Sequence, residues 1–450
     1  MKKFSNGCVR LMQRWLPDAF LFAVILTIIV YIGAIAATGL GPIAMVEAWA
    51  SDSGFWSLLS FSMQMALVCV TGTAFAQAPI MKKILDKIAS LAHNKLTALL
   101  VICYVSAIAN FLNWGFGLVV GALVAKAVAK RNPDLDYPLM IAAAYAGFLI
   151  WHAGLSGSIP LDLSAGKVFG EVTYQAGLNE TIFHPMNLIM VIVYSLGLPF
   201  VMLAQHPDEK DTKKINPAML VDEEAKVYSK DTPAEKMENS KILWGIVVLA
   251  GLIYIVYYFV TKGFNLGLNI VNFIFMFLGI LAHGTLRSYI DAFADATVGA
   301  SGVLLQFPFY AGIMGMMTAK NDAGNCLAAV LSNFFVNIST NLTFPMFSFL
   351  AAGVVNFFVP SGGGQWAVQG PIMMPAGRAI YGEGHDGITA MAVAWGDQWT
   401  NMIQPFWALP ALGVAGLGAK DIMGYLVTVL IYGGIIACIG FVCWAGIFII

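Results

Sequence analysis

The sequence predicts an all-α polytopic membrane protein with two inverted-topology repeats, each containing a re-entrant helical hairpin and a broken helix. The first observation is composition: of 450 residues, 59% are hydrophobic and 11% charged, whereas a soluble domain carries about 25% charged residues. The second is that the apolar residues form segments long enough to span a bilayer. The third is that these segments follow a similar order in both halves. The scarcity of charge excludes a disordered chain, and a net charge of −1 argues against nucleic-acid binding.

Eleven apolar segments can be marked along the chain, at 16–38, 54–78, 96–130, 137–160, 182–204, 242–261, 268–284, 300–318, 342–381, 388–418 and 421–450. Two of them, 96–130 and 342–381, are too long for a single crossing and have glycine-rich centres. Each is predicted to form a re-entrant hairpin, in which two half-length helices meet at a tip inside the membrane. The other nine segments are predicted to cross once each, which gives about nine full crossings.

The basic residues orient this topology. Lysines and arginines lie on both sides of the first hairpin, within 82–95 and 126–131. Because basic residues favour the cytoplasmic side, both ends of this segment belong there, as a hairpin requires. We expect a cytoplasmic N-terminus and an external C-terminus. The outer loops then hold 4 of the 24 basic residues, namely Lys167, Lys262, Lys320 and Arg378.

The halves of the chain resemble each other in detail. Asn110-Phe111 precedes the first hairpin tip as Asn356-Phe357 precedes the second, and Met63-Gln64-Met65 matches Leu305-Gln306-Phe307. Pro160 and Pro405 follow the interruptions of the two broken helices and are 245 residues apart. These matches predict a first repeat at 1–204, with a broken helix at 137–160, and a second at 262–450, with a broken helix at 388–418.

Two segments separate the predicted repeats. Residues 205–241 hold 16 of the 49 charged residues and are predicted to form a cytoplasmic linker. The extra helix 242–261 then starts the second copy on the opposite side of the membrane. The repeats are therefore inverted, as in many secondary transporters.

The two hairpin tips and the two broken helices are the strongest functional signal. Interrupted helices leave unpaired backbone groups, which lipid tolerates only where they line a cavity or bind a ligand. Half-helix N-termini attract anions, and freed carbonyls can hold a cation. The residues at these breaks that are predicted to bind substrate are Asn113, Trp114, Gly115, Ser156, Gly157, Ser158, Ser361, Gly362, Gly363, Gly364, Gln365, Trp366, Gln398, Asn401 and Gln404.

The residue types at the breaks favour a small monoanion with a short apolar tail. No Lys or Arg lies within the four breaks, whereas a dicarboxylate or phosphate site usually contains arginine, which binds such oxygens bidentately. Several tryptophans crowd the same segments and could surround an alkyl tail, although ordinary packing is an equally good interpretation.

Two ionisable residues are predicted to lie within the membrane, Asp397 beside the second broken helix and His152 beside the first. Ionisable groups are costly in hydrocarbon and are functional candidates there. We expect Asp397 to couple transport to H⁺ or Na⁺, with structural hydrogen bonding as the alternative. His152 is a second coupling candidate, and a Na⁺ ion could be held by Asn113, Ser361 and Asp397.

Nothing in the sequence indicates an enzyme. The chain contains no HExxH, GxSxG, P-loop or CxxC motif, and its six cysteines lie singly. We therefore expect no catalytic residues and no cofactor other than the coupling ion.

Four stretches resemble the AtoE family of bacterial short-chain fatty acid transporters. They are Asn113-Trp-Gly-Phe-Gly-Leu-Val-Val-Gly121, Phe307-Pro-Phe-Tyr-Ala-Gly312, Val359-Pro-Ser-Gly-Gly-Gly364 and Gln404-Pro-Phe-Trp-Ala-Leu-Pro-Ala-Leu412. The resemblance extends over essentially the whole chain and places it in the ion transporter superfamily. It implies a multi-pass protein of the bacterial cytoplasmic (inner) membrane, homodimers, elevator-type movement and uptake of acids such as butyrate and acetoacetate.

The resemblance also bears on the site. The superfamily's small polar motif at each hairpin tip maps onto Asn113 to Gly115 and onto Ser361 to Gly363. The Ser-Asn-Thr triplets of its dicarboxylate members are absent there, which argues against their substrates and their Na⁺ geometry. The function predicted is symport of short-chain monocarboxylates. The alternatives are a dicarboxylate or amino-acid-derivative transporter on the same scaffold, and a passive anion channel.

Overall fold

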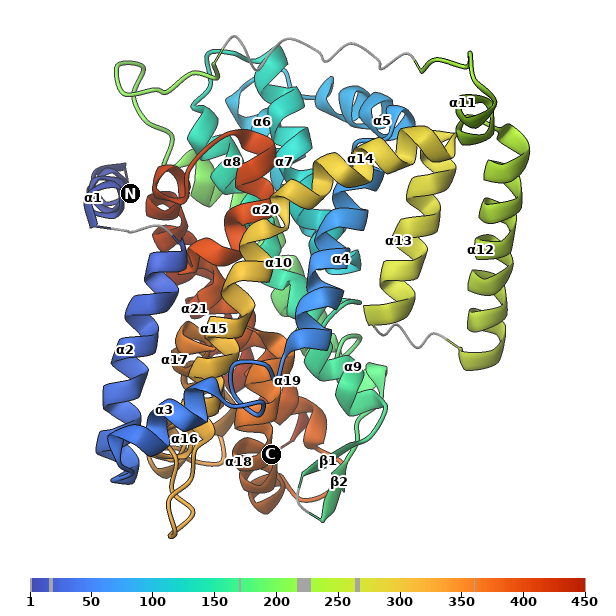
Figure 1. Ribbon diagram of the computed structural model, residues 1–450. Helices are drawn as coiled ribbons and strands as arrows, with labels where there is room; N and C mark the ends of the chain where they lie inside the picture. Colours follow the sequence, from blue (N-terminus) through green and yellow to red (C-terminus); the bar gives the residue numbers. More distant parts are fainter. Residues whose placement is uncertain are drawn as a thin grey trace.

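The computed structural model describes residues 2–15, 19–169, 171–216, 228–263, 268–359 and 361–449 and is almost entirely helical (Figure 1). The elements of the first half are α1 (Lys2–Trp15), α2 (Ala19–Thr38), α3 (Pro42–Ala50), α4 (Leu59–Ala76), α5 (Pro79–Ala89), α6 (Lys95–Leu112), α7 (Trp114–Arg131), α8 (Tyr137–Ala146), η1 (Gly147–Ala153), α9 (Ser158–Ser164), β1 (Lys167–Phe169), β2 (Val172–Tyr174), η2 (Leu178–Glu180) and α10 (Pro185–Leu203).

The second half of the chain is also helical. Its elements are α11 (Pro233–Glu238), α12 (Lys241–Lys262), α13 (Leu268–His283), α14 (Leu286–Gly299), α15 (Ser301–Thr318), α16 (Leu327–Asn337), α17 (Phe344–Phe358), α18 (Gly362–Tyr381), α19 (Asp386–Thr400), η4 (Asn401–Ile403), α20 (Pro405–Ala415) and α21 (Ala419–Phe448). The short helices α14 and α16 and the antiparallel pair of β1 and β2 were not predicted.

Within the described residues, six helical stretches are long and apolar enough to cross a membrane, at 59–76, 95–112, 137–164, 185–203, 233–262 and 419–448. A seventh is obtained if α14 and α15, bent by 46°, are taken as one span. The count does not confirm the nine predicted crossings. Three of them contain only shorter apolar helices, at 23–38, 269–283 and 405–415, and the stretch 95–112 belongs to a predicted hairpin. The first predicted crossing begins at 16–18, which lie outside the described residues.

The first predicted hairpin is present as α6 and α7. Asn113 ends α6, and its side-chain oxygen accepts the Phe116 N–H at 2.9 Å, which caps α7. At the other end of the hairpin, Asn132 Nδ2 donates to the Ala92 carbonyl at 3.0 Å. Contacts at both ends show that the two helices run antiparallel along their whole length.

The second predicted hairpin is present as α17 and α18. Ser361 caps α18 by accepting the Gly364 N–H at 3.2 Å, and at the base the Tyr381 hydroxyl donates to the Asn341 carbonyl at 2.5 Å. Pro360, part of the predicted tip, lies outside the described residues. The two hairpins come in from opposite ends of the molecule (Figure 1). That they re-enter the membrane, and that the halves form inverted repeats, stay predictions.

Both predicted broken helices are interrupted where the sequence places the breaks. In the first, α8 passes into the 3₁₀ turn η1, and residues 154–157 separate it from α9. In the second, α19 passes into η4, and Gln404 separates that turn from α20. A proline at the first turn of α20 has no N–H to leave unpaired, which favours a helix start there.

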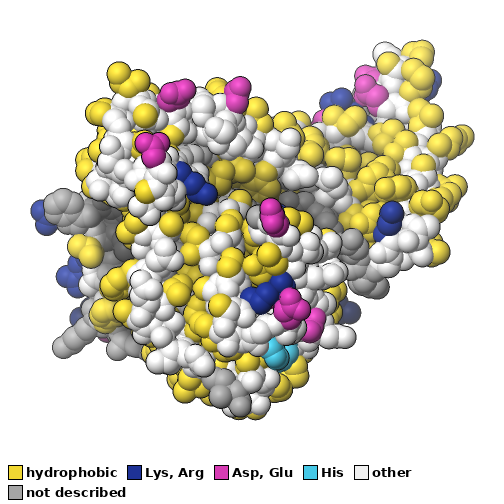
Figure 2. Space-filling view, turned by 90° about the horizontal axis from the view of Figure 1, so that it is seen from below, with side chains coloured by type: hydrophobic (Ala, Val, Ile, Leu, Met, Phe, Trp, Pro, Cys, Tyr) yellow, Lys and Arg dark blue, Asp and Glu magenta, His cyan; other side chains and the backbone are white. Residues whose placement is uncertain are grey.

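The described residues of the predicted charged linker, 205–216 and 228–241, lie at the end of the molecule opposite β1 and β2 (Figure 1). Its first part is fixed to the body because the buried Asp136 carboxylate accepts the Lys213 N–H at 2.9 Å and the Tyr425 hydroxyl at 3.2 Å. Residues 217–227 of the linker lie outside the described residues. The predicted extra helix is α12, whose apolar side chains are mostly exposed; Figure 2 shows the α12–α13 arm standing out from the body.

Candidate functional site

The first break is packed against the tip of the first hairpin. Ser156 Oγ accepts the Trp114 N–H at 3.0 Å, and the Leu155 N–H donates to the Phe111 carbonyl at 2.7 Å. A Cβ at Gly154 would lie 2.3 Å from the same carbonyl oxygen. Glycine is therefore needed here because backbone meets backbone without room for a side chain.

The tip of the second hairpin packs against the same break. A Cβ at Gly362 would lie 2.5 Å from Ser158 Oγ and 2.7 Å from His152 Cε1. At the neighbouring Gly363 the nearest atoms, on Phe61, are 3.6 Å away or more. The first break is thus held between two hairpin tips that are far apart in the sequence.

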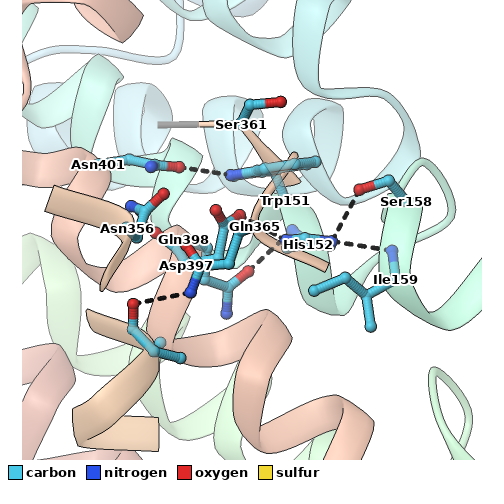
Figure 3. Close-up of polar contacts among 12 residues, drawn as sticks. Trp151, His152, Ser158, Ile159, Asn356, Ser361, Gln365, Asp397, Gln398 and Asn401 are labelled. Atoms are coloured by element: carbon cyan, nitrogen blue, oxygen red, sulfur yellow. Dashed lines mark hydrogen bonds and ion pairs between the residues drawn. The ribbon is translucent and has the colours of Figure 1, made fainter. Parts of the chain in front are cut away.

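The two predicted coupling residues touch each other. His152 Nδ1 lies 2.6 Å from Asp397 Oδ2, and both side chains have zero exposure (Figure 3). On the other side of the ring, the Ile159 N–H donates to His152 Nε2 at 3.0 Å, and Ser158 Oγ is 3.1 Å from the same nitrogen. A backbone N–H can only donate, so Nε2 must be an acceptor. This assigns the proton of a neutral His152 to Nδ1, from which it is donated to Asp397.

The side chain of Gln398 satisfies backbone donors of the first break. Its Oε1 accepts the N–H groups of His152 at 2.8 Å and of Ala153 at 3.0 Å. Asn401 Oδ1 accepts the Trp151 Nε1–H at 2.9 Å, and Asn401 Nδ2 donates to Gln404 Oε1 at 2.9 Å. The second break thus supplies the partners that an interrupted helix in lipid requires.

Asn356, at the end of α17, belongs to this network and was not predicted as a site residue. Its Nδ2 donates to the Asp397 carbonyl at 2.6 Å and to Thr400 Oγ1 at 2.8 Å, while Gln404 Nε2 donates to the Asn356 carbonyl at 2.5 Å. The signal that could have revealed it was the recurrence of Asn-Phe before each hairpin tip, which predicted the repeat but was not extended to the site.

Several buried polar atoms here have no hydrogen-bond partner among the described residues. Three are acceptor oxygens: Asp397 Oδ1, Asn356 Oδ1 and Gln365 Oε1. Figure 3 shows Asn356 on the side of Asp397 away from the His152 ring. Unpartnered buried acceptors are costly, and these oxygens are better placed to receive a proton or cation than Asn113 and Ser361, whose side-chain oxygens cap α7 and α18.

A cavity of about 790 Å³ opens beside the first break. Four of the predicted substrate residues line it: Ser156, Ser158, Gly363 and Trp366. The network of Asp397, Gln398, Asn401 and Gln404 lies behind the cavity wall and does not line it. The remaining predicted residues, Asn113, Trp114, Gly115, Gly157, Ser361, Gly362, Gly364 and Gln365, build and cap the breaks and tips around it.

The predicted aromatic wall is present mainly as a packed cluster. Trp151 stacks on His152 with ring centroids 4.2 Å apart and on Phe148 at 5.7 Å, and Trp114 meets Trp407 edge-on at 5.4 Å. Of the tryptophans, Trp366 lines the large cavity, and its buried Nε1 has no partner among the described residues.

The chain is similar to known transporters over nearly its whole length. Residues 1–444 match a family described as short chain fatty acid transporter. A protein of Escherichia coli (strain K12) named "Putative short-chain fatty acid transporter" is 42% identical over 445 residues, 97% of this chain and 98% of that protein. One of Haemophilus influenzae is 41% identical over 98% of this chain and 99% of its own length. Among solved structures, the antimetabolite efflux pump MtrF of Neisseria gonorrhoeae shares 14% identity at a TM-score of 0.47, with 99% of this chain and 97% of that chain covered.

Proposed function

Because this chain belongs to the short-chain fatty acid transporter family, we propose that it is a secondary active symporter that moves acids such as butyrate and acetoacetate together with H⁺ or Na⁺. The family is one of membrane transporters, so the chain is a transporter and not an enzyme. The proposal concerns the coupling ion, the substrates and the mode of movement.

The observation that carries the coupling proposal is the buried contact between His152 and Asp397. The carboxylate has one oxygen bonded to His152 and the other without a partner among the described residues. A half-satisfied carboxylate in the interior favours binding of a proton or cation, because either removes the cost of the buried charge. The contact between this carboxylate and His152 also joins the two breaks. Binding of a proton or cation at the carboxylate can therefore affect the packing of both breaks.

Proton coupling and Na⁺ coupling differ in the number of oxygen ligands that the ion requires. A proton on Asp397 Oδ1 requires no further ligand. A Na⁺ ion would require several oxygens, and Asn356 Oδ1 and Gln365 Oε1, which have no partner among the described residues, are candidates. The structure therefore supports Asp397 as the coupling residue under either ion.

The cavity suits a monocarboxylate. Ser156 and Ser158 offer hydroxyl donors to carboxylate oxygens, while Leu161, Ile270 and other apolar side chains line the remaining surface. A single lysine, and no arginine, lies among the lining residues, which favours one negative charge over two.

The remaining parts of the proposal follow from the resemblance and from the charge distribution. We propose a homodimer in the bacterial inner membrane, with a cytoplasmic N-terminus, an external C-terminus and elevator-type alternating access. The first break is packed between the tips of both hairpins. The break and the two tips can therefore move as one unit, which is what elevator-type movement requires.

The test is uptake of radiolabelled acetoacetate and butyrate into proteoliposomes under imposed gradients. Protonated short acids cross bilayers unaided, so protein-free liposomes under the same gradients provide the background to subtract. Accumulation above equilibrium with an inward Na⁺ gradient at equal pH, or with an inward proton gradient above that background, supports symport and identifies the ion. Equilibration without accumulation under either gradient would contradict symport and favour the passive channel. Preference for dicarboxylates would favour the other alternative.

A further inference from the structure

The molecule contains two large cavities of almost equal size at opposite ends. The first, of about 790 Å³, lies between α4, α9, β1, α12, α13 and α18, at the end that carries the β-hairpin. The second, of about 780 Å³, lies between α2, α15, α20 and the start of α21. Figure 1 shows α9 and β1, which line the first cavity, at one end of the molecule, and α20, which lines the second, nearer the opposite end.

The two cavities are built from matching segments. Gln64 lines the first and Gln306 lines the second, and these glutamines occupy the same place in the matched stretches Met63-Gln64-Met65 and Leu305-Gln306-Phe307. Gln306 is 3% exposed, and its Oε1 has no partner among the described residues. The matched glutamines therefore give the two cavities corresponding places in the two halves of the sequence.

An apolar partition lies between the cavities. Next to each glutamine, Met65 and Phe307 border a gap of about 10 Å³ that Phe406, Trp407 and Trp114 close from the other sides. The Phe307 and Phe406 rings are 5.4 Å apart, as are those of Phe406 and Trp407. So small a space holds about one water molecule at most, and an organic acid cannot pass it in this conformation.

Each cavity has one basic residue in its lining. In the first it is Lys167, which forms an ion pair with Asp162 at 2.7 Å; both side chains are partly exposed, at 33% and 40%. The lysine is positioned by β1, which Phe169 anchors to Trp366 of the second hairpin with ring centroids 5.2 Å apart. In the second it is the exposed Lys420 at the start of α21, and the residues that line this cavity include no Asp or Glu.

We propose that these cavities are the outer and inner vestibules of one carboxylate path, and that Lys167 and Lys420 bind the carboxylate at its two ends. The proposal rests on the transport of monocarboxylates proposed above. At Lys167 the substrate exchanges with the Asp162 carboxylate, so one ion pair replaces another and the partly exposed Asp162 carboxylate is released to solvent. At Lys420, which has no ion-pair partner among the described residues, the substrate displaces no other carboxylate. Neither lysine lies within the breaks, so the binding is an initial step that precedes contact with Ser156 and Ser158.

The test compares Lys167→Gln with Lys420→Gln in right-side-out cells and in inverted membrane vesicles. Each variant is the matched control for the other, since both lose one positive charge. We expect each to raise the KM for butyrate about two- to fivefold from one face only, as the loss of a partly exposed ion pair predicts, with maximal rate unchanged. The membrane face from which the KM rises must be opposite for the two variants. The effect should shrink in high salt, which screens exposed charges.

Two further variants sharpen the test. Asp162→Asn should lower the KM from the Lys167 face, because it removes the competing carboxylate, and Lys167→Arg should restore the wild-type value. Unchanged KM from both faces, or equal changes from both faces in each variant, would overturn the proposal. Failure of the unaltered protein to transport any carboxylate would instead overturn the proposed function and this inference with it.

Discussion

His152 Nδ1 and Asp397 Oδ2 are 2.6 Å apart, and this contact joins the interruptions of the two broken helices. The two residues occupy equivalent positions, since each is eight residues before the proline that follows its break, Pro160 or Pro405. If the halves are inverted repeats, as the sequence predicts, residues related by their two-fold axis meet each other only near that axis. The contact therefore places the buried carboxylate where both halves of the chain can respond to its charge.

Removing His152 should destabilise the protein through Asp397. In His152→Ala the buried carboxylate loses its partner and the Ile159 N–H loses its acceptor, which predicts a loss of about 3–5 kcal/mol. Adding Asp397→Ala to His152→Ala removes the unpaired charge. The double variant should therefore be at least about 1 kcal/mol more stable than the sum of the two single-variant losses predicts. Thermal unfolding in detergent measures this, with the exposed His93→Ala as control. Additive losses would show that the contact contributes no coupling.

The two glycines of the second hairpin tip should differ in their tolerance of alanine. Gly362→Ala places a methyl group 2.5 Å from Ser158 Oγ and 2.7 Å from His152 Cε1, which predicts a loss of about 1–3 kcal/mol and slower transport. Gly363→Ala meets only Phe61, at 3.6 Å or more, and should unfold at nearly the wild-type temperature. Equal unfolding temperatures for both variants would contradict the close approach of this tip to the first break.

The orientation can be tested with an impermeant thiol reagent. The background replaces Cys8, Cys438 and Cys443, the partly exposed cysteines among the described residues, with serine. A cysteine at exposed Lys230 in the linker should be labelled only after permeabilisation, whereas one at exposed Glu171, between β1 and β2, should be labelled in intact cells. The reverse pattern would invert the predicted topology.

The hairpin tips and helix breaks could be predicted from the sequence because each is a short polar or glycine-rich interruption of an apolar segment. Asn113 and Gln404 lie at the interruptions where they were expected. Such signals are local: lipid excludes unpaired backbone groups, so an interruption within an apolar segment is informative without knowledge of its neighbours.

Contacts between distant segments could not be predicted in the same way. The roles of Asn356 and Lys167 depend on which segment packs against α19 and on where the β-hairpin folds back, and neither is encoded in a local pattern. The His152–Asp397 contact is an intermediate case. Its spacing of 245 residues equals that of Pro160 and Pro405, so the predicted repeat makes the two residues equivalent. Equivalent positions in the sequence do not by themselves show that two side chains touch.

The most direct test of the account compares Asp397→Asn with the unaltered protein in two assays on the same proteoliposomes. Asparagine resembles a protonated aspartate and can still accept the hydrogen bond of His152, so the variant should fold and exchange labelled for unlabelled acetoacetate. It should lose accumulation driven by the coupling-ion gradient, while the exposed-loop variant Asp322→Asn keeps it. Exchange without accumulation is the result that we predict. Accumulation by Asp397→Asn equal to that of the unaltered protein would contradict the assignment of coupling to this carboxylate.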